Sequence, residues 1–454
     1  MPSKHTQTLS AAEFHRLLDG GYRNLKAHGA EVDALNVFPV PDGDTGKNMG
    51  MTLGGGVART DPAGADVGDY MRAFSRNALL SARGNSGVIL SQFIRGIAKA
   101  AEDAGTLTPA LFATACRRGA EQAYRAVSKP VEGTILTLMR EGADYLGAHE
   151  FADFEACFEG LVNQQREALA RTPEQLAVLK EAGVVDSGGA GLVCILEGMR
   201  MALLGEWTED AQAPAMEAPV TAPVAQGAGD APRKRYGVVA VASGEGIIRL
   251  LRENGADAVI DGGHTRNPSS QELLEAIAGV NAEHVVVLPN DGNIILTARQ
   301  AAALCEGTDV RVLETRSFAE GYAALSIMNP DLESPEALLR EMAEGAEGVE
   351  TGLVTRAIRD SELQGRTVRE GDWLGLRGHE ILAVAESPES AALGLLAAIS
   401  GMDERSVITA FHDGKPGRDE RDAIASGVSA RWPEIEFGFE YGGQDVYRYI
   451  FVIE

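Results

Sequence analysis

The stretch NVFPVPDGDTGKNM, residues 36–49, decides how the first half of this chain is interpreted. It places Asp42 and Asp44 on either side of one glycine, with two prolines shortly before them. Proline fixes φ and glycine permits tight turns, so the segment keeps two like charges close together. Carboxylate oxygens held in this way suit Mg²⁺, and Asn36 offers a third oxygen. The competing interpretation is a solvated acidic turn, because Asp and Gly are common turn residues.

Three further Gly-rich joints favour the metal site: SARGNSGV at 81–88, EGT at 132–134 and VVDSGGAG at 184–191. Each places a hydroxyl residue beside glycine at the expected start of a helix, where backbone amides can bind phosphate. Each joint alone is also an ordinary capped helix start. Four such joints in one helical domain favour a Mg²⁺–nucleotide site over coincidence. The chain has neither GxxxxGK[ST] nor a strand-linked GxGxxG, which excludes P-loop and Rossmann sites.

The first half is predicted to be helical. Its apolar residues recur at three- and four-residue spacing, which is typical of helices packed on a core. Loops carried on such a scaffold are a common location for binding residues. The predicted helices span 11–29, 69–80, 86–103, 109–127, 134–147 and 190–204.

The second half begins after an Ala- and Pro-rich segment, which predicts a flexible linker over 207–234. From 235 to 347, short β-branched runs alternate with helical stretches, a rhythm that predicts βαβ units on a parallel sheet. From 348 to 454 the pattern changes to more closely spaced strands, and this region is either a second α/β lobe or a continuation of the first.

The composition excludes several classes of partner. The chain has 454 residues, more than one core usually serves, and its 66 acidic and 41 basic residues give a net charge of −25. Such a surface repels phosphates and anionic lipid, so we expect no nucleic acid partner. No apolar run approaches the roughly 20 residues needed to span a bilayer, so we expect no stable membrane insertion. The four cysteines form no CxxC pair, which is typical of core residues in a reducing compartment. MPSKHTQTLS lacks an apolar signal core, so the predicted location is the cytoplasm.

The four joints together resemble the DhaL-like nucleotide-binding domain of dihydroxyacetone kinases and of the fatty acid kinase ATP-binding subunit, the FakA type. The wording NVFPVPDGDTG looks like the fatty acid kinase branch in particular. ASGEGI, DGGHTRNPSSQELLEAI, VVVLPNDGNIILTA and EYGGQDVYRYIFVIE in the second half are similar to that branch as well. The resemblance covers nearly the whole chain outside the linker. It implies an N-terminal all-α eight-helix barrel followed by an α/β, DegV-like region.

The resemblance also implies that the loops of the barrel hold ATP with two Mg²⁺ ions. Asp42, Asp44 and Asn36 stand at the positions of the metal ligands. Asp42 and Asp44 also form the predicted catalytic set with Arg83, which could add positive charge near the phosphates or lie at the surface. The predicted nucleotide-binding residues are Thr45, Gly46, Asn48, Gly84, Asn85, Ser86, Gly87, Gly133, Thr134, Asp186 and Gly188.

The implied reaction is ATP-dependent phosphorylation of a fatty acid carboxylate to an acyl phosphate. The fatty acid would be presented by a separate fatty-acid-binding carrier protein of the FakB/DegV type, docked on residues 348–454. A carboxylate is already ionised at neutral pH and needs no general base. The alternatives are a dihydroxyacetone-type small-molecule phosphotransferase and a nucleotide-sensing adaptor without turnover. A homodimer is left open.

Two departures from the family pattern stand out. Lys47 replaces the threonine that follows DGDTG in many relatives, and it either adds charge near the phosphates or is exposed. Longer members carry a middle module with Cys and His-x-His, whereas this chain has only the Ala/Pro linker at that place. Roles that depend on the module are therefore not expected here. In the second half, His264 lies in a loop and is assigned no catalytic role.

Overall fold

The computed structural model describes residues 5–36, 43–206, 233–263, 266–358, 360–363 and 365–454. The chain divides into two compact units, a helical one up to residue 206 and an α/β one from residue 233. Each unit has hydrophobic clusters of its own. The predicted linker lies almost entirely outside the described residues, and its last residue, Lys234, already begins the first strand.

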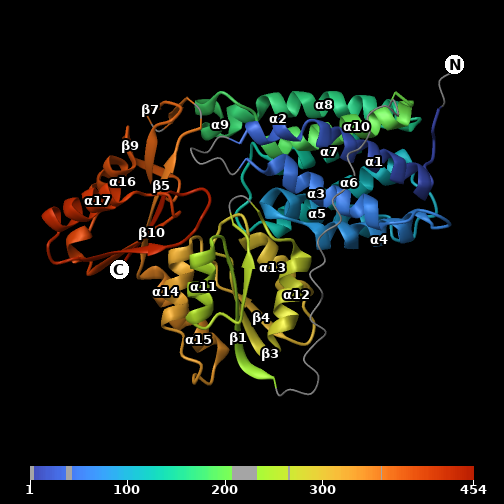
Figure 1. Ribbon diagram of the computed structural model, residues 1–454. Helices are drawn as coiled ribbons and strands as arrows, with labels where there is room; N and C mark the ends of the chain where they lie inside the picture. Colours follow the sequence, from blue (N-terminus) through green and yellow to red (C-terminus); the bar gives the residue numbers. More distant parts are fainter. Residues whose placement is uncertain (1–4, 37–42, 207–232, 264–265, 359, 364) are drawn as a thin grey trace. The chain divides into compact units, whose positions relative to one another are not determined.

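The described part of the helical unit contains eight helices of 14 to 22 residues and two of six residues. The longer helices form a closed ring in which each packs on the next and α10 returns to α1 (Figure 1). This ring confirms the predicted eight-helix domain. The helices are α1 (Ala11–Ala27), α2 (Gly29–Ala34), α3 (Thr45–Arg59), α4 (Val67–Ser81), α5 (Gly84–Ala100), α6 (Pro109–Ala126), α7 (Ile135–Ala148), α8 (Phe154–Gln175), α9 (Ala177–Ala182) and α10 (Ser187–Leu204).

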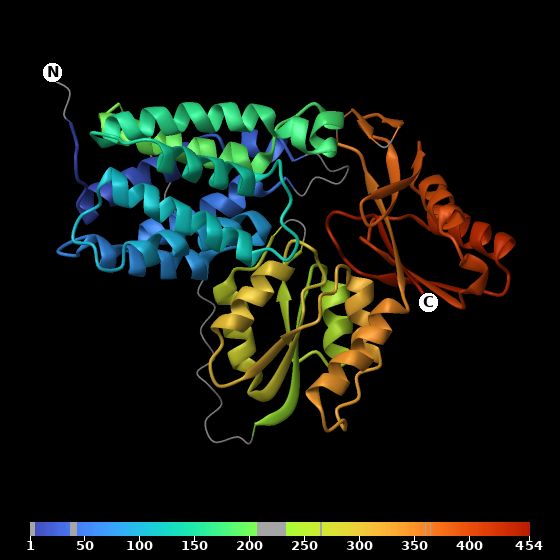
Figure 2. The same cartoon turned by 180° about the vertical axis from the view of Figure 1, so that it is seen from behind.

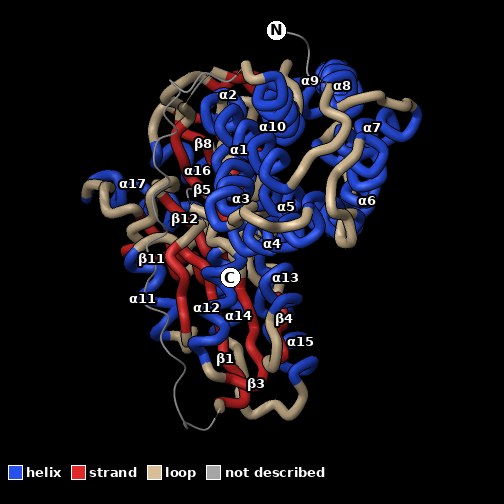
Figure 3. Tube along the Cα trace, turned by 90° about the vertical axis from the view of Figure 1, so that its right-hand side faces the viewer, coloured by secondary structure: helices blue, strands red, loops and turns tan. Residues whose placement is uncertain are grey.

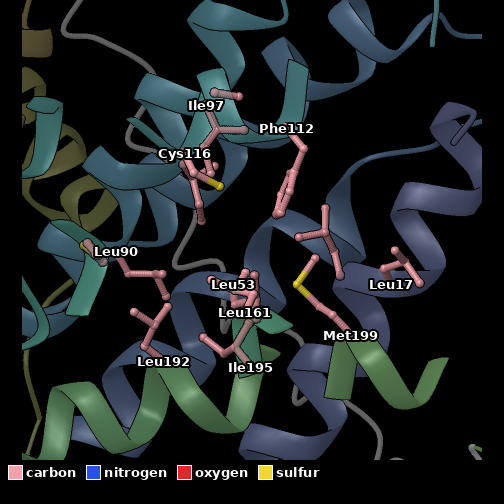
Figure 4. Close-up of a cluster of buried hydrophobic side chains, with 14 of the residues drawn as sticks. Leu17, Leu53, Leu90, Ile97, Phe112, Cys116, Leu161, Leu192, Ile195 and Met199 are labelled. Carbon is pink, nitrogen blue, oxygen red and sulfur yellow. The ribbon is translucent and has the colours of Figure 1, made fainter. Parts of the chain in front are cut away.

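The interior of the ring is filled by apolar side chains from all around it, including Leu53, Phe112, Leu161 and Ile195 (Figure 4). These side chains surround a cavity of about 70 Å³. Ligand pockets typically offer roughly 300–1,000 Å³, so this interior is a packed core rather than a pocket for a large ligand.

Helix α3 was not among the predicted helices because its sequence, TGKNMGMTLGGGVAR, contains five glycines. Glycine costs about 1 kcal/mol relative to alanine in a helix interior, which weakens the local signal. The structure gives the reason for three of them. A Cβ at Gly54 would lie 2.6 Å from the Tyr22 ring, one at Gly55 2.1 Å from Ser81 Oγ, and one at Gly56 2.8 Å from a ring carbon of Phe74. Glycine therefore allows α3 to approach its neighbours closely.

Helix α10 is the one helix in the described parts of the chain that is long and apolar enough to cross a membrane, with a mean hydropathy of 1.3 over 18 residues. Half of it is buried inside the helical unit. A Cβ at Gly198 would lie 2.3 Å from the carbonyl oxygen of Gly20, so α10 packs directly on the backbone of α1. The apolar side chains of α10 thus pack in the barrel core.

The second unit begins with the predicted parallel sheet, which is coloured yellow-green to yellow in Figure 2. Its strand order is β2-β1-β3-β4. Alternate residues of β1 face opposite sides: Val238 and Ala240 pack with α11, α14 and α15, whereas Val239 and Val241 pack with α12 and α13. The elements are β1 (Lys234–Ala242), α11 (Glu245–Glu253), β2 (Ala258–Asp261), α12 (Ser270–Val280), β3 (Ala282–Leu288), α13 (Ile295–Leu304), β4 (Asp309–Val312), α14 (Phe318–Ser326) and α15 (Pro335–Glu347).

A second, mixed sheet follows in the order β11-β10-β12-β5-β8-β9, and the strands of both sheets are red in Figure 3. Only its β10–β11 pair is parallel. A short hairpin, β6 and β7, lies outside it. The elements are β5 (Glu350–Arg356), β6 (Ser361–Leu363), β7 (Arg366–Val368), β8 (Trp373–Arg377), β9 (Glu380–Ala385), α16 (Pro388–Ala398), the 3₁₀ helix η1 (Met402–Glu404), β10 (Val407–His412), α17 (Arg418–Arg431), β11 (Glu436–Tyr441) and β12 (Tyr449–Ile453).

The two sheets share one hydrophobic cluster, in which the rings of Phe318 and Phe411 meet edge to face with centroids 5.0 Å apart. The Gly442 carbonyl also accepts hydrogen bonds from the amides of Gly246 and Ile247, at 3.0 and 3.2 Å. The region after residue 348 is therefore a continuation of the same compact unit rather than a separate lobe. These results confirm the predicted multidomain class, all-α followed by α/β.

Candidate functional site

The site predicted from the sequence centres on the start of α3. Asp44 is the N-cap residue of this helix, and its carbonyl accepts the Asn48 amide at 2.7 Å. The Asp44 side chain makes no capping bond to the helix. Asn36 follows α2, and its amide donates to the carbonyl of Asp33 at 3.1 Å. Asp42 lies outside the described residues.

Asp33 caps α3 from the neighbouring helix α2. Its Oδ1 accepts the amides of Gly46 at 2.6 Å and Lys47 at 3.4 Å. Burial raises the pKa of the Asp33 carboxyl, against the opposing effect of these two amides and of the Lys47 charge. Asp33 is not among the residues predicted from the sequence, because a carboxylate that caps a helix 13 residues away leaves no local pattern. The Lys47 side chain itself is exposed.

The start of α10 lies beside the start of α3, since the hydroxyls of Thr45 and Ser187 are 3.1 Å apart. Asp186 caps α10 through a bond of 2.6 Å from the Gly189 amide to its Oδ2, and its own amide donates to Thr172 Oγ1. Burial raises the pKa of Asp186 to about 6, although the amides of Gly189 and Ile135 lower it. This carboxylate thus touches the first turns of both α10 and α7.

The start of α7 is held by a set of side-chain bonds around Glu132. Its carboxylate accepts hydrogen bonds from Thr137 Oγ1 at 2.6 Å, Tyr124 Oη at 2.9 Å and Arg140 at 3.0 Å. Burial alone would raise the pKa of Glu132, but these three bonds together lower it. Gly133 adopts a φ of +81°, which favours glycine. Thr134 is the N-cap of α7 without a capping bond from its side chain, which donates instead to the Val131 carbonyl.

The start of α5 is the fourth predicted joint, with Asn85 and Ser86 in its first turn. Arg83 is its N-cap residue and makes no capping bond through its side chain. Gly84 has a φ of +58°. A Cβ at Gly87 would lie 2.4 Å from Thr52 Oγ1 and 3.2 Å from the Asn48 carbonyl, so this turn is pressed against α3.

The described site residues therefore gather where four helices begin. The start of α3 contacts those of α10 and α5, and a Cβ at Gly188 would lie 3.1 Å from Ile135, which links α10 to α7. A group of three His, Cys, Asp or Glu ligands is not found within the described ranges, which leave out Asp42. The remaining donors fit Mg²⁺ in kind, because the side chains of Asp44 and Asn36 can each supply a hard oxygen atom.

In the second unit, the described loops that resemble the family also meet. A Cβ at Gly244 would lie 2.5 Å from the Gly442 carbonyl oxygen, and Asn290 Nδ2 donates to the Val241 carbonyl at 3.0 Å. His264 lies outside the described residues. The loop leading into α12 ends in a capping box, in which Ser269 and Glu272 satisfy each other's backbone amides. At the start of α11, the amides of Gly246 and Ile247 are already taken by the Gly442 carbonyl. The first turns of both helices are therefore engaged within the protein.

The DAK2 domain model matches residues 39–201, and the C-terminal model of FakA-like fatty acid kinase proteins matches residues 237–454. The chain is 32% identical to Protein YloV of Bacillus subtilis (strain 168) over 549 aligned positions, which cover 98% of this chain and 99% of YloV. Because the alignment is longer than this chain, YloV carries residues without a counterpart here.

Two solved structures resemble parts of the chain. A DegV family protein, Cg2579 from Corynebacterium glutamicum, aligns at 16% identity and a TM-score of 0.36, covering 48% of this chain and 96% of that one. The dihydroxyacetone kinase of C. freundii aligns at 15% identity and a TM-score of 0.39, covering 49% and 48%. Both scores are low, so the assignment rests on the family models and on YloV. The chain belongs to the FakA-type family of kinase-related proteins, with a DAK2, or DhaL-like, domain in its N-terminal half.

Proposed function

We propose that this protein phosphorylates the carboxylate of a fatty acid with ATP, and that a separate fatty-acid-binding carrier presents the acid. The product is an acyl phosphate. In this proposal the helical unit binds ATP and Mg²⁺, residues 207–234 act as a linker, and the region 348–454 docks the carrier. An ATP-dependent reaction of this kind fits the cytoplasm, the location expected from the cysteine usage.

The observation that carries the proposal is a difference among four neighbouring helix starts: a carboxylate side chain binds the first backbone amides of some of them but not of others. The amides that begin α3 are bonded to Asp33, and an amide that begins α10 is bonded to Asp186. The N-cap residue of α5, Arg83, makes no such side-chain bond, whereas at the start of α7 the Ile135 amide is bonded to Asp186. Backbone amides at a helix start favour phosphate, so we assign the phosphates to the Gly84–Gly87 turn of α5.

The metal ligands of the proposal are Asp42, Asp44 and Asn36. Bound Mg²⁺ would neutralise the charge of the ATP phosphates, since phosphoryl transfer depends mainly on alignment and on charge stabilisation. Asp44 suits this role because its side chain does not cap α3. The Arg83 guanidinium, at the start of α5, would add positive charge near the transferring group.

The separate carrier is supported by the size of the barrel interior. The cavity of about 70 Å³ is too small for a long acyl chain. The acceptor carboxylate is ionised at neutral pH, so the reaction requires no general base from this chain.

The test combines the purified full-length protein with ATP, Mg²⁺, oleate and a fatty-acid-binding carrier, and measures acyl phosphate. We expect Asp44→Ala to lower the rate by on the order of 100-fold, because it removes charge stabilisation at the phosphates. Asp69→Ala on the exposed face of α4 is the matched control and should retain the wild-type rate. Full activity of the Asp44 variant would refute the site. Transfer to a small hydroxylated acceptor without any carrier would instead identify the dihydroxyacetone-type reaction.

A further inference from the structure

Asp33 lies in the last turn of α2, yet its carboxylate closes the first turn of another helix. Oδ1 receives the amides of Gly46 and Lys47, at 2.6 and 3.4 Å. The first amides of a helix have no partner within it, so a side chain, water or a ligand must satisfy them. A negative charge at this end is also favoured by the helix dipole.

The residue that would ordinarily perform this capping is Asp44, which stands at the N-cap of α3. An N-cap aspartate usually accepts an amide from the second or third residue of its helix. Asp44 does not, and its ψ of 6° differs from the extended backbone of the other aspartate N-caps, Asp66, Asp153 and Asp186. The start of α3 therefore has two carboxylates with separate tasks, and the more distant one satisfies the backbone.

The backbone around Asp33 is shaped to permit this arrangement. A Cβ at Gly46 would lie 2.6 Å from the Gly29 carbonyl oxygen and 3.2 Å from Asp33 Oδ1. A Cβ at Gly43 would lie 2.9 Å from the Asp33 carbonyl oxygen. The two glycines that flank Asp44 and Thr45 thus allow the loop to lie directly on α2, where the Asp33 carboxylate can reach the amides.

We propose that Asp33 is a positioning residue, which fixes Asp44 at the site by tying the start of α3 to α2. This inference rests on the proposed Mg²⁺–ATP site. Because Asp33 accepts the amides of Gly46 and Lys47, these amides do not bind phosphate, and the start of α3 is closed without a capping bond from Asp44. Asp33 itself touches neither nucleotide nor metal in this arrangement; it acts through the backbone of residues 43–47.

Two measurements on the full-length protein test the proposal, in variants that differ only at Asp33. Hydrogen exchange by mass spectrometry on the unliganded protein reports the amides of Gly46 and Lys47, and calorimetry reports binding of ATP with Mg²⁺. We expect Asp33→Ala to speed exchange in this segment and to weaken Mg²⁺–ATP binding by about tenfold, since a charge-assisted bond is lost. Asp33→Asn keeps an acceptor oxygen and should stay within about threefold of the wild type in both measurements.

Asp153→Ala is the matched control. Asp153 also caps a helix, because its carboxylate accepts the Ala156 amide at 2.9 Å. The capped turn is the start of α8, which is not one of the four helix starts of the proposed site; α9 and α10 follow the opposite end of α8. This variant should lose stability without losing Mg²⁺–ATP affinity. If Asp33→Ala fails to fold, Asp33→Asn and Asp33→Ser provide the comparison, because serine is too short to reach both amides.

The outcomes separate the two proposals. Wild-type protein that does not bind Mg²⁺–ATP would refute the proposed function, and the exchange data would still test the tie between α2 and α3. Wild-type binding together with unchanged exchange and affinity in the folded Asp33→Ala or Asp33→Ser variant would overturn the role of Asp33. Equal losses in the Asp33 and Asp153 variants would overturn it too, since a general loss of stability would then explain both.

Discussion

Asp186 should make the helical unit less stable at neutral pH than a neutral side chain would. Its carboxyl caps α10 and touches the start of α7, and burial raises its pKa from 3.8 to about 6. The folded protein therefore holds this proton more tightly than the unfolded chain. Stability from this group is highest below the ordinary pKa, falls as the pH rises towards the folded pKa, and stays low above it. The full difference in the free energy of unfolding, between low pH and high pH, is about 3 kcal/mol, because one pKa unit corresponds to about 1.4 kcal/mol.

The perturbation is Asp186→Asn, which keeps an oxygen for the Gly189 amide and removes the charge. Between about pH 5 and about pH 8, the free energy of unfolding of the wild type should fall by about 1.4 kcal/mol relative to that of the variant. This is the part of the full difference that falls in this pH range. The variant should also be the more stable protein at the higher pH. Hydrogen exchange on peptides from α10 measures the stability of the helical unit alone, so the unfolding of the two units is not treated as one transition.

Asp153→Asn provides a control of opposite sign. The amide of Ala156 and the side chain of His5 lower the pKa of Asp153, so its charge stabilises the fold above the ordinary pKa. This variant should be less stable than the wild type near neutral pH, and the loss should shrink as the pH falls. If Asp186→Asn shows the same pH dependence as the wild type, or if both variants lose stability alike, the reasoning about the buried carboxylate is wrong.

Two further substitutions test the packing of the units. Gly198→Ala should destabilise the helical unit by about 1–3 kcal/mol, because its Cβ would press on a backbone carbonyl of α1. Gly50→Ala, with nothing within 4 Å of its Cβ, should instead gain up to about 1 kcal/mol, and thermal melting followed by circular dichroism distinguishes the two. In the second unit, Glu420→Ala should cost about 3 kcal/mol, because it removes both bonds to the largely buried Arg448. Trp432 packs in the same hydrophobic cluster as α17, so its fluorescence should show the Glu420→Ala variant unfolding at a lower urea concentration than the wild type. An unchanged urea midpoint would exclude a stabilising role for the Glu420–Arg448 pair.

The sequence by itself determined the order and type of most elements. Apolar spacing located the six predicted helices of the first unit to within a few residues, because one buried face imposes a regular period. Alternating β-branched runs predicted the parallel sheet for a similar reason. Glycine with a hydroxyl or acidic residue marked the starts of α5, α7 and α10, since capping is chemistry between residues close in the chain. The resemblance to the fatty acid kinase family rested on these joints, and the comparisons confirmed it.

Only the tertiary structure decided which of those joints meet and which amides are already occupied. No local pattern places Asp33 against Gly46, or Thr45 against Ser187, which lies 142 residues further along the chain. Helix α3 forms despite five glycines, because its close contacts with neighbouring helices outweigh its low propensity. The raised pKa of Asp186 likewise follows from burial among α7, α8 and α10. Local periodicity is set by one face of one element, whereas capping across helices and the burial of a charge depend on how several elements pack.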